Sequence, residues 1–157
     1  MIIKAIVDED FSNYKKPSML IGFPRCSWKC EKECGMRVCQ NGVLATAKDI
    51  EVSVDEIINR YLNNKLTTAV VCGGLEPLDS WSDLLLFIEK FRTKSQDYIV
   101  IYTGYNKEEI ADKIDILKRF PNIILKTGRY LPGYEKHYDE VLGVELASPN
   151  QHAEVIS

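Results

Sequence analysis

The chain has 157 residues, of which 45% are hydrophobic and 27% charged, with a formal net charge of −3. These values are ordinary for a globular protein, and we expect one domain over residues 1–157 with a proper hydrophobic core. The mildly negative charge and the lack of a basic stripe argue against a nucleic-acid partner, and no apolar stretch approaches the ~20 residues of a membrane span.

The N-terminal sequence MIIKAIVDEDF is a short apolar run followed at once by acidic residues. This pattern predicts a strand over residues 1–7 rather than a signal peptide. A second strand is predicted at residues 18–22. Without an export signal we expect a reducing, cytoplasmic location.

Four cysteines follow within fourteen residues, namely Cys26, Cys30, Cys34 and Cys39, in a loop predicted from residue 23 to about residue 44. In a reducing compartment such clustering favours a metal over disulfides. The gaps of three, three and four residues contain no CxxC pair of the kind typical of tetrahedral zinc. They favour an iron–sulfur cluster, whose soft iron and sulfide suit thiolates. A zinc loop formed by all four cysteines and a disulfide pair remain as alternatives.

The rest of the chain alternates helical and strand patterns. Ser53 and Glu56 form a capping box that predicts a helix, and the last cysteine of the chain, Cys72, ends a β-branched run as a small buried hydrophobe. The remaining predictions are a strand at 67–72, a helix at 80–91 capped by Ser80, a strand at 97–103, a helix at 107–120, a strand at 122–126 and a last strand at 141–146.

Alternating strands and helices imply right-handed βαβ units and a mostly parallel sheet. The predicted fold class is α/β, as a partial (incomplete) α/β barrel or a curved, mostly parallel sheet with flanking helices. Functional sites of such folds lie in loops past the carboxyl ends of the strands. The cysteine loop, Gly73-Gly74, Gly104 and Gly128 all fall in those loops.

Four segments resemble the radical S-adenosylmethionine superfamily, and within it the activating proteins of anaerobic ribonucleoside-triphosphate reductase. They are residues 26–30 (CSWKC), Cys39-Gln40-Asn41, residues 73–78 (GGLEPL) and residues 100–105 (VIYTGY). Weaker similarities are Gly128-Arg129-Tyr130 and residues 148–151 (SPNQ). The resemblance covers nearly the whole chain and implies one radical S-adenosylmethionine domain.

The cysteine spacing departs from the CxxxCxxC motif of that superfamily. After Cys30, Cys34 follows three residues later and Cys39 eight residues later. We favour Cys26, Cys30 and Cys39 as metal ligands, because Asn41 follows Cys39 as the family pattern requires, and we keep Cys34 as the alternative third ligand. The family's glycine motif also carries an inserted Leu75 here.

The resemblance implies a [4Fe–4S] cluster held by three thiolates, with the fourth iron left open for S-adenosylmethionine. The residues assigned to this cofactor are Gly73, Gly74, Glu76, Pro77, Thr103 and Gly104. Exposed backbone at the two glycines is expected to bond the amino and carboxylate groups of the methionine moiety, while Glu76 either accepts from that amino group or fixes the loop. Thr103 and Gly104 either meet the ribose or adenine or simply end a strand before a helix that Asn106 caps. No catalytic side chain beyond the cluster is expected.

The implied activity is reductive cleavage of S-adenosylmethionine to a 5′-deoxyadenosyl radical, which abstracts hydrogen from a glycine Cα of a large glycyl-radical enzyme, with anaerobic ribonucleotide reductase the favoured partner. A flavodoxin or ferredoxin is implied as the electron donor. The alternatives are a radical enzyme with a small-molecule substrate and a non-catalytic iron–sulfur or zinc protein. The two histidines, His137 and His152, are predicted to be isolated and to bind no metal.

Overall fold

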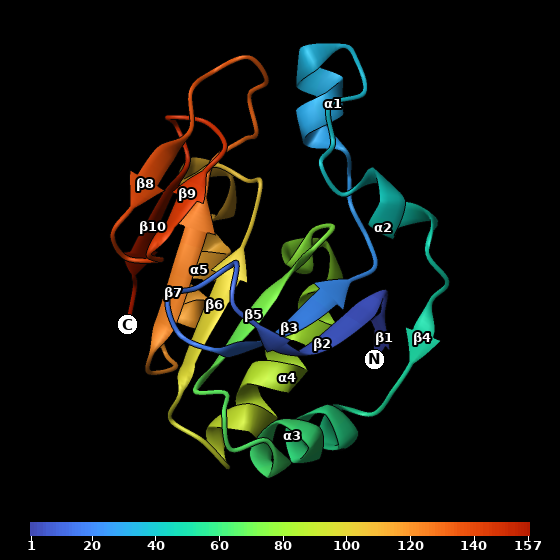
Figure 1. Cartoon of the computed structure of the whole chain (residues 1–157), viewed down its shortest axis with the longest axis vertical. Helices are drawn as coiled ribbons and strands as arrows, with labels where there is room; N and C mark the ends of the chain where they lie inside the picture. The colour runs from blue at the N-terminus through green and yellow to red at the C-terminus, as the bar shows by residue number, and fades with distance from the viewer.

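The computed structural model describes all residues 1–157 as a mixed α/β protein built on one six-stranded sheet (Figure 1). The strand order is β10-β7-β6-β5-β3-β2, and the sheet does not close on itself. This confirms the prediction of an open, mostly parallel sheet with flanking helices. None of the helices combines the length and the apolar composition that crossing a bilayer requires.

The sheet consists of β2 (Ala5–Asp10), β3 (Ser18–Phe23), β5 (Ala69–Gly74), β6 (Tyr98–Tyr102), β7 (Ile123–Thr127) and β10 (His152–Val155). Two small antiparallel pairs are β1 (Ile2–Ile3) with β4 (Ile50–Glu51), and β8 (His137–Asp139) with β9 (Val144–Leu146). The α-helices are α1 (Lys29–Cys34), α2 (Gly42–Thr46), α3 (Val54–Asn63), α4 (Trp81–Arg92) and α5 (Ala111–Leu117), and two 3-10 helices are η1 (Pro77–Ser80) and η2 (Lys107–Ile110).

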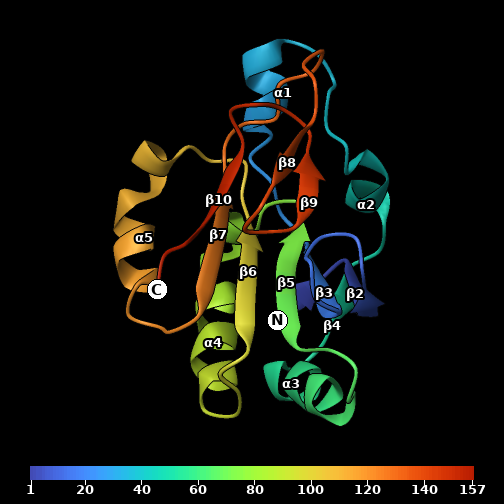
Figure 2. The same ribbon diagram turned by 60° about the vertical axis from the view of Figure 1, so that its left-hand side comes forward.

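Strands β3, β5, β6 and β7 are parallel neighbours, and β2 and β10 pair with the two outer ones in the antiparallel sense. The carboxyl ends of the four parallel strands therefore meet at one end of the sheet. The segment that carries α1 and α2 leaves β3 at this end, and Figure 2 shows α1 above the tips of the strands. The fold thus brings the cysteines to the end of the sheet where α/β proteins bind ligands.

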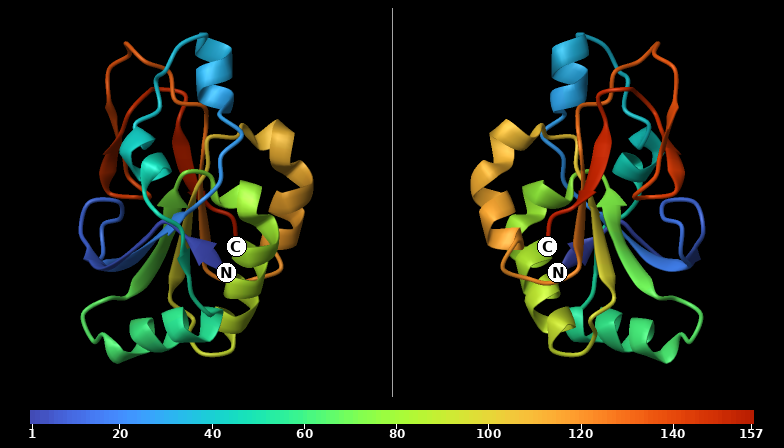
Figure 3. Two further views of the ribbon diagram at one scale, coloured as in Figure 1. Left: turned by 90° about the vertical axis from the view of Figure 1, so that its right-hand side faces the viewer. Right: turned by 90° about the vertical axis from the view of Figure 1, so that its left-hand side faces the viewer.

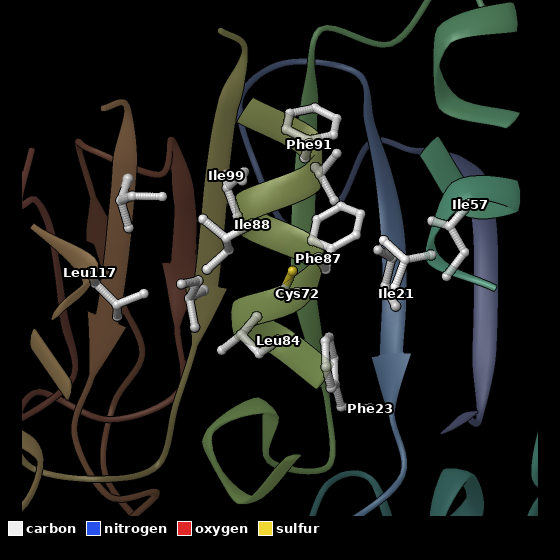
Figure 4. Close-up of a cluster of buried hydrophobic side chains, with 14 of the residues drawn as sticks. Ile21, Phe23, Ile57, Cys72, Leu84, Phe87, Ile88, Phe91, Ile99 and Leu117 are labelled. Carbon is white, nitrogen blue, oxygen red and sulfur yellow. The ribbon is translucent and has the colours of Figure 1, made fainter. Parts of the chain in front are cut away.

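The two faces of the sheet carry different covers, because successive side chains of a strand point to opposite sides. On one face Val70, Cys72, Ile99 and Ile101 pack against α4 and α5 in the larger core, and Figure 4 shows Phe87 and Phe91 of α4 in it. Cys72 is fully buried there, as a small hydrophobe.

The opposite face is covered by a smaller cluster, and α4 and α5 lie on the other side of the sheet (Figure 3). Strand residues Val71, Val100 and Ile124 pack there against Tyr14 and Leu146. Toward the carboxyl ends, this face stays open as a cavity.

Three sequence predictions need correction. The N-terminal strand is interrupted at Lys4, whose side chain turns away to pair with Asp49, so that β1 joins β4 and only β2 joins the main sheet. The predicted last strand shrinks to β9, because the chain turns through Gly143 at φ 71°, and β10 follows it. Ser80 does not cap α4, since the chain enters that helix directly from η1 and the Ser80 hydroxyl has no hydrogen-bond partner.

Candidate metal centre

A cavity of about 450 Å³ lies at the carboxyl ends of the parallel strands, on the face opposite α4 and α5. The side of this cavity that the sheet forms consists of alternate residues, namely Leu20, Gly22, Val71, Gly73, Tyr102 and Lys126. Cys26, Cys30 and Cys39 line the same cavity, whereas Cys34 does not. Of the residues assigned to the cofactor, Gly73, Gly74, Glu76, Thr103 and Gly104 line it, and Pro77 lies buried outside it in η1.

Three different local structures present the three thiols. Cys26 follows β3 in an extended segment, Cys30 lies in the first turn of α1, and Cys39 lies between α1 and α2. Trp28 adopts φ 58° between the first two, and its N–H donates to Cys26 Sγ at 3.2 Å. This left-handed residue reverses the chain direction, and both thiols then line one cavity.

A hydrogen-bonded triad ties the start of the loop to the sheet. Asp79 accepts from the Ser27 N–H at 2.6 Å and from the Tyr105 hydroxyl at 2.5 Å, and the Ser27 and Tyr105 hydroxyls lie 3.2 Å apart. Asp79 belongs to η1 and Tyr105 follows β6, so that the backbone next to Cys26 is fixed to two elements. Asp79 was not singled out from the sequence, whereas Tyr105 was placed at this strand end together with Thr103 and Gly104.

An ion-pair network holds α1. The buried Arg129 donates to Glu33 at 2.8 Å, to Glu109 at 2.8 Å and to the Gly104 carbonyl at 2.8 Å. Lys29 also donates to Glu109 at 2.8 Å. The hydrogen bond from Lys29, followed by those from the Asn106 N–H and Arg129, lowers the pKa of Glu109 to about 2. Since Lys29 and Glu33 flank Cys30 in α1, this network fixes the helix that presents the Cys30 thiol.

Cys39 is connected to the glycine motif through Asn41. The Asn41 side-chain amide donates to the Gly74 carbonyl at 2.6 Å, and the Asn41 N–H lies 3.4 Å from Cys39 Sγ. Gly74 has φ 88°, and a Cβ there would lie 2.8 Å from Gly22 Cα. Only glycine fits this position, and its close approach to β3 exposes the carbonyl that Asn41 uses.

The environment of the thiols requires a cation for them to act as thiolates. Burial raises the pKa of Cys26 to about 11. Burial also raises the pKa of Cys30, against the opposing hydrogen bond from the Tyr130 N–H and the positive charge of Arg129. A bound metal supplies the charge that lets such thiols ionise.

The three thiols fit a cluster better than a single ion. No three His, Cys, Asp or Glu side chains lie close enough together to hold one metal ion, yet Cys26, Cys30 and Cys39 line one cavity. A polynuclear cluster is wider than an ion and accepts ligands that lie farther apart. Cys26, Cys30 and Cys39 are the thiols that would hold a [4Fe–4S] cluster in this cavity, and the choice of Cys39 over Cys34 stays a prediction.

Glu76 links the ends of two strands beside this site. Its carboxylate accepts from the Leu78 N–H at 3.1 Å and from the Gly104 N–H at 2.9 Å. Burial raises the pKa of Glu76 to about 7. A Cβ on Gly104 would lie 3.5 Å from Cys30 Sγ and 3.7 Å from Glu76 Oε2, so both the thiol and the carboxylate lie beside Gly104. Of the two roles considered for Glu76, fixing the loop is the one with hydrogen bonds in this structure.

Lys126 is the main cavity residue that the sequence reasoning missed. It is the penultimate residue of β7, has 6% of its surface exposed and lines the cavity. The sequence could have indicated this position. Ile124 and Lys126 are two residues apart in a predicted strand, so their side chains must lie on the same face of the sheet.

The two segments with weaker similarity, residues 128–130 and 148–151, contact each other in the structure. The Asn150 side chain donates to the Arg129 carbonyl at 2.7 Å, and a Cβ on Gly128 would lie 2.6 Å from the Asn150 carbonyl oxygen. Gln151 lines the cavity and bonds the Ala147 N–H. These residues brace the strand end that carries Arg129.

The two histidines, predicted to be isolated, are neighbours in the folded protein. The rings of His137 and His152 lie 5.7 Å apart, because β8 and β10 bring residues distant in sequence together. Both ring nitrogens of His137 are buried without a hydrogen-bond partner, and no third metal-binding side chain joins the pair.

Comparison with known proteins gives one match. The model of a family described as 4Fe-4S single cluster domain matches residues 19–145, which includes all four cysteines of the loop. No curated protein and no solved structure matches the chain. The matched range begins in β3 and ends in β9, so it covers most of the residues that line the cavity.

Proposed function

The chain belongs to the 4Fe-4S single cluster domain family, and from this we propose that it is a radical S-adenosylmethionine protein that activates a glycyl-radical enzyme. The observation that carries the proposal is the shared cavity of Cys26, Cys30 and Cys39 with the Gly73-Gly74 backbone. Three thiols leave one iron of a cubane without a protein ligand. A cofactor with its own nitrogen and oxygen donors suits that position.

When bound, the cluster supplies the electron that splits S-adenosylmethionine into methionine and a 5′-deoxyadenosyl radical, which takes a hydrogen atom from the substrate. The chain itself binds and orients the reacting groups and excludes water from them. Gly73 and Gly74 offer backbone groups to the methionine moiety, while Glu76 keeps the ends of β5 and β6 at a fixed distance through its bond to the Gly104 N–H. Thr103 and Gly104 line the cavity just after β6, and in this proposal they contact the ribose or the adenine.

A protein substrate suits the rim of the cavity. Met36 and Val43 in the cysteine segment are 63% and 88% exposed, and Tyr134 in the segment after β7 is 60% exposed. Both segments contribute cavity residues, although these three side chains do not themselves line the cavity. Exposed apolar groups around a site favour closure by a partner protein. We therefore propose a large glycyl-radical enzyme as the substrate, anaerobic ribonucleotide reductase first, and a flavodoxin or ferredoxin as the electron donor.

The test is anaerobic reconstitution with iron and sulfide, followed by incubation with S-adenosylmethionine and dithionite. We expect about four irons and four sulfides per chain, an EPR spectrum that changes when S-adenosylmethionine is added, and the release of 5′-deoxyadenosine and methionine. Cys30→Ala, treated identically, is the control and should release neither product.

The outcomes separate the alternatives. A full cluster whose EPR spectrum ignores S-adenosylmethionine, with no cleavage product, would reject the activity and leave an electron carrier. One tightly held zinc and no iron would support a structural zinc protein instead. Cleavage that needs a small molecule, and not a partner protein, would replace the proposed substrate class.

A further inference from the structure

A second, more open hollow lies on the outer side of the cysteine loop. Its walls include Arg25, Cys26 and Trp28 from the link between β3 and α1, Ala45 of α2 and Asp79 of η1. The left view of Figure 3 shows this link running over the surface between α2 and the helices that cover the sheet. Cys26 lines both this outer hollow and the cavity, whereas the other two predicted ligands line the cavity but not the hollow. Cys26 is therefore the thiol that can be approached from two sides.

The two sides of Cys26 suit different partners. Under the function proposed above, the cavity holds S-adenosylmethionine beside the cluster, and the substrate that loses a hydrogen atom must reach that cavity. An electron donor has a simpler requirement. Because the rate of electron transfer falls steeply with distance, the donor needs a surface position close to one cluster ligand. A donor at the outer hollow comes close to Cys26 without entering the cavity, so the substrate can cover the cavity independently of it.

The cysteine segment is positively charged in a protein that is negatively charged elsewhere. Residues 24–49, which link β3 to β4, hold five cations and three acids, whereas the remaining residues hold 15 cations and 20 acids. Two of the three acids, Glu33 and Asp49, pair with cations outside the segment. Of the five cations only Lys29 forms an ion pair. The cations that remain free are Arg25, Lys32, Arg37 and Lys48.

Two of these free cations belong to the hollow or its border. Arg25 lines the hollow and is exposed. Lys48, also exposed, follows three residues after Ala45. The acid of the hollow, Asp79, already accepts two hydrogen bonds from the chain, which offset part of its charge. Free positive charge around a hollow attracts an acidic protein surface and raises the rate of encounter.

We propose that the outer hollow is the docking site of a small acidic one-electron donor protein, and that the electron enters through Cys26. The reduced donor gives up one electron and is itself oxidised by one electron. That electron is taken up by the oxidised cluster, whose positive charge falls by one, and no bond forms or breaks. The need for an electron rests on the function proposed above. The location rests on the free cations and on the position of Cys26 between the two hollows.

The test follows reduction of the reconstituted cluster by rapid-mixing absorbance, with an acidic flavodoxin in its reduced form as the donor. Arg25→Glu should slow this reduction at low salt by about tenfold or more, because reversing the charge replaces attraction of the donor with repulsion. Added salt should slow the wild type and bring the two rates together. Dithionite is a small reductant that needs no docking site, so it should reduce the wild type and Arg25→Glu at the same rate.

Lys94→Glu is the matched control, because it makes the same change of charge at the opposite end of the sheet. Lys94 is exposed, forms no ion pair and lies in the turn between α4 and β6. This variant should accept electrons from flavodoxin as the wild type does. Lys48→Glu is a second variant at the border of the hollow and should also slow the reduction. It replaces Arg25→Glu in the comparison if the thermal transition shows that Arg25→Glu does not fold.

Failure of the two proposals can be told apart. If dithionite supports cleavage of S-adenosylmethionine but flavodoxin reduces the wild type and Arg25→Glu equally fast, or reduces neither, the docking site is overturned and the function stands. If no cluster forms or no cleavage occurs, the affinity for oxidised flavodoxin, measured by titration calorimetry, is the second readout. Affinity that is lost in Arg25→Glu and kept in Lys94→Glu would uphold the docking site without the proposed function. Equal affinity in both variants, or no binding by the wild type, would overturn the docking site too.

Discussion

Asn41 distinguishes Cys39 from Cys34. Its side chain reaches the Gly74 carbonyl at 2.6 Å, so the backbone two residues after Cys39 is attached to the end of β5. Cys34 is the last residue of α1, and it is followed by Gly35 at φ 67°, which ends the helix outside the cavity. The choice of Cys39 as third ligand stays a prediction, and this difference in attachment is its physical basis.

Replacing single cysteines tests that choice. Cys26→Ala, Cys30→Ala and Cys39→Ala should each lose the cluster, because three thiolates are the fewest that hold a cubane with one open iron. Cys34→Ala should keep most of it. Iron and sulfide content after anaerobic reconstitution measures the result, with Cys72→Ala as a control that removes a thiol from the core.

The opposite pattern, with the cluster lost in Cys34→Ala and kept in Cys39→Ala, would show that the third ligand is Cys34. Equal loss in all four loop variants would instead favour a four-thiolate centre with no open iron. That result would remove the basis for binding S-adenosylmethionine at the cluster.

At the scale of elements, α1 is held by charge rather than by apolar packing. It has no buried residue, and its links to the sheet are Glu33 to Arg129 and Lys29 to Glu109. Glu109 also bonds the Asn106 N–H in a capping box that starts η2. One carboxylate therefore connects the cysteine-bearing helix to α5.

This arrangement predicts an acid-sensitive contribution to stability. The pKa of Glu109 is about 2 in the folded protein, below its ordinary value of 4.5. A carboxyl group with a lowered pKa in the folded protein stabilises the fold fully at pH values above its pKa in the unfolded chain. That stabilisation is lost as the pH falls toward the pKa of the group in the folded protein. Urea unfolding of the cluster-free protein should therefore show the wild type losing its advantage over Glu109→Gln between about pH 4.5 and pH 2.

Glutamine keeps the capping geometry and removes the charge, so the comparison isolates the ion pairs. Glu108→Gln is the matched control, because Glu108 is the neighbour of Glu109 in sequence, is exposed and forms no ion pair. Added salt should shrink the difference, since the Glu109 side chain is 28% exposed. A difference between wild type and Glu109→Gln that is independent of pH would contradict the prediction.

The sequence predicted the central strands well and the outer elements poorly. The runs at 67–72, 97–103 and 122–126 are rich in β-branched residues and buried at their centres, and they became β5, β6 and β7 within two residues at each end. Strand β10 has the sequence HAEV and two exposed residues, so its strand state depends on pairing with β7 and not on local preference.

The site residues divide in the same way, into those that the central strands position and those that depend on contacts between distant segments. Residues that end predicted strands, such as Gly73, Gly74 and Thr103, could be assigned to the site from the parallel topology alone. Asp79 could not. Arg129 and Tyr105 lay in segments that the sequence had named, but their contacts were not predictable, because these contacts join segments that are 20 to 96 residues apart in the chain. Sequence patterns report periodicity within one element and carry no information on such contacts.

At the scale of the whole molecule, one face of the sheet is closed by α4 and α5, and the other carries the site under a partial cover. The stability of the protein is therefore uneven. The larger core has 22 buried residues, whereas α1 and α2 of the cysteine segment have none. Segments with few buried contacts open locally at low cost, well before global unfolding.

Removing the cluster should make the cysteine segment more susceptible to proteolysis. A bound cluster would join three points of the cysteine segment, and any group that binds only the closed state opposes opening. Trypsin should cut after Lys29, Lys32 or Arg37 at least on the order of tenfold faster in the chelator-treated protein than in the reconstituted one. Cleavage after Lys65, an exposed residue outside the segment, is the internal control and should not change. Equal cleavage rates within the segment in both forms would mean that Arg129, Glu109 and Asn41 fix it without the cluster, and the thiols would then be held in place before any metal binds.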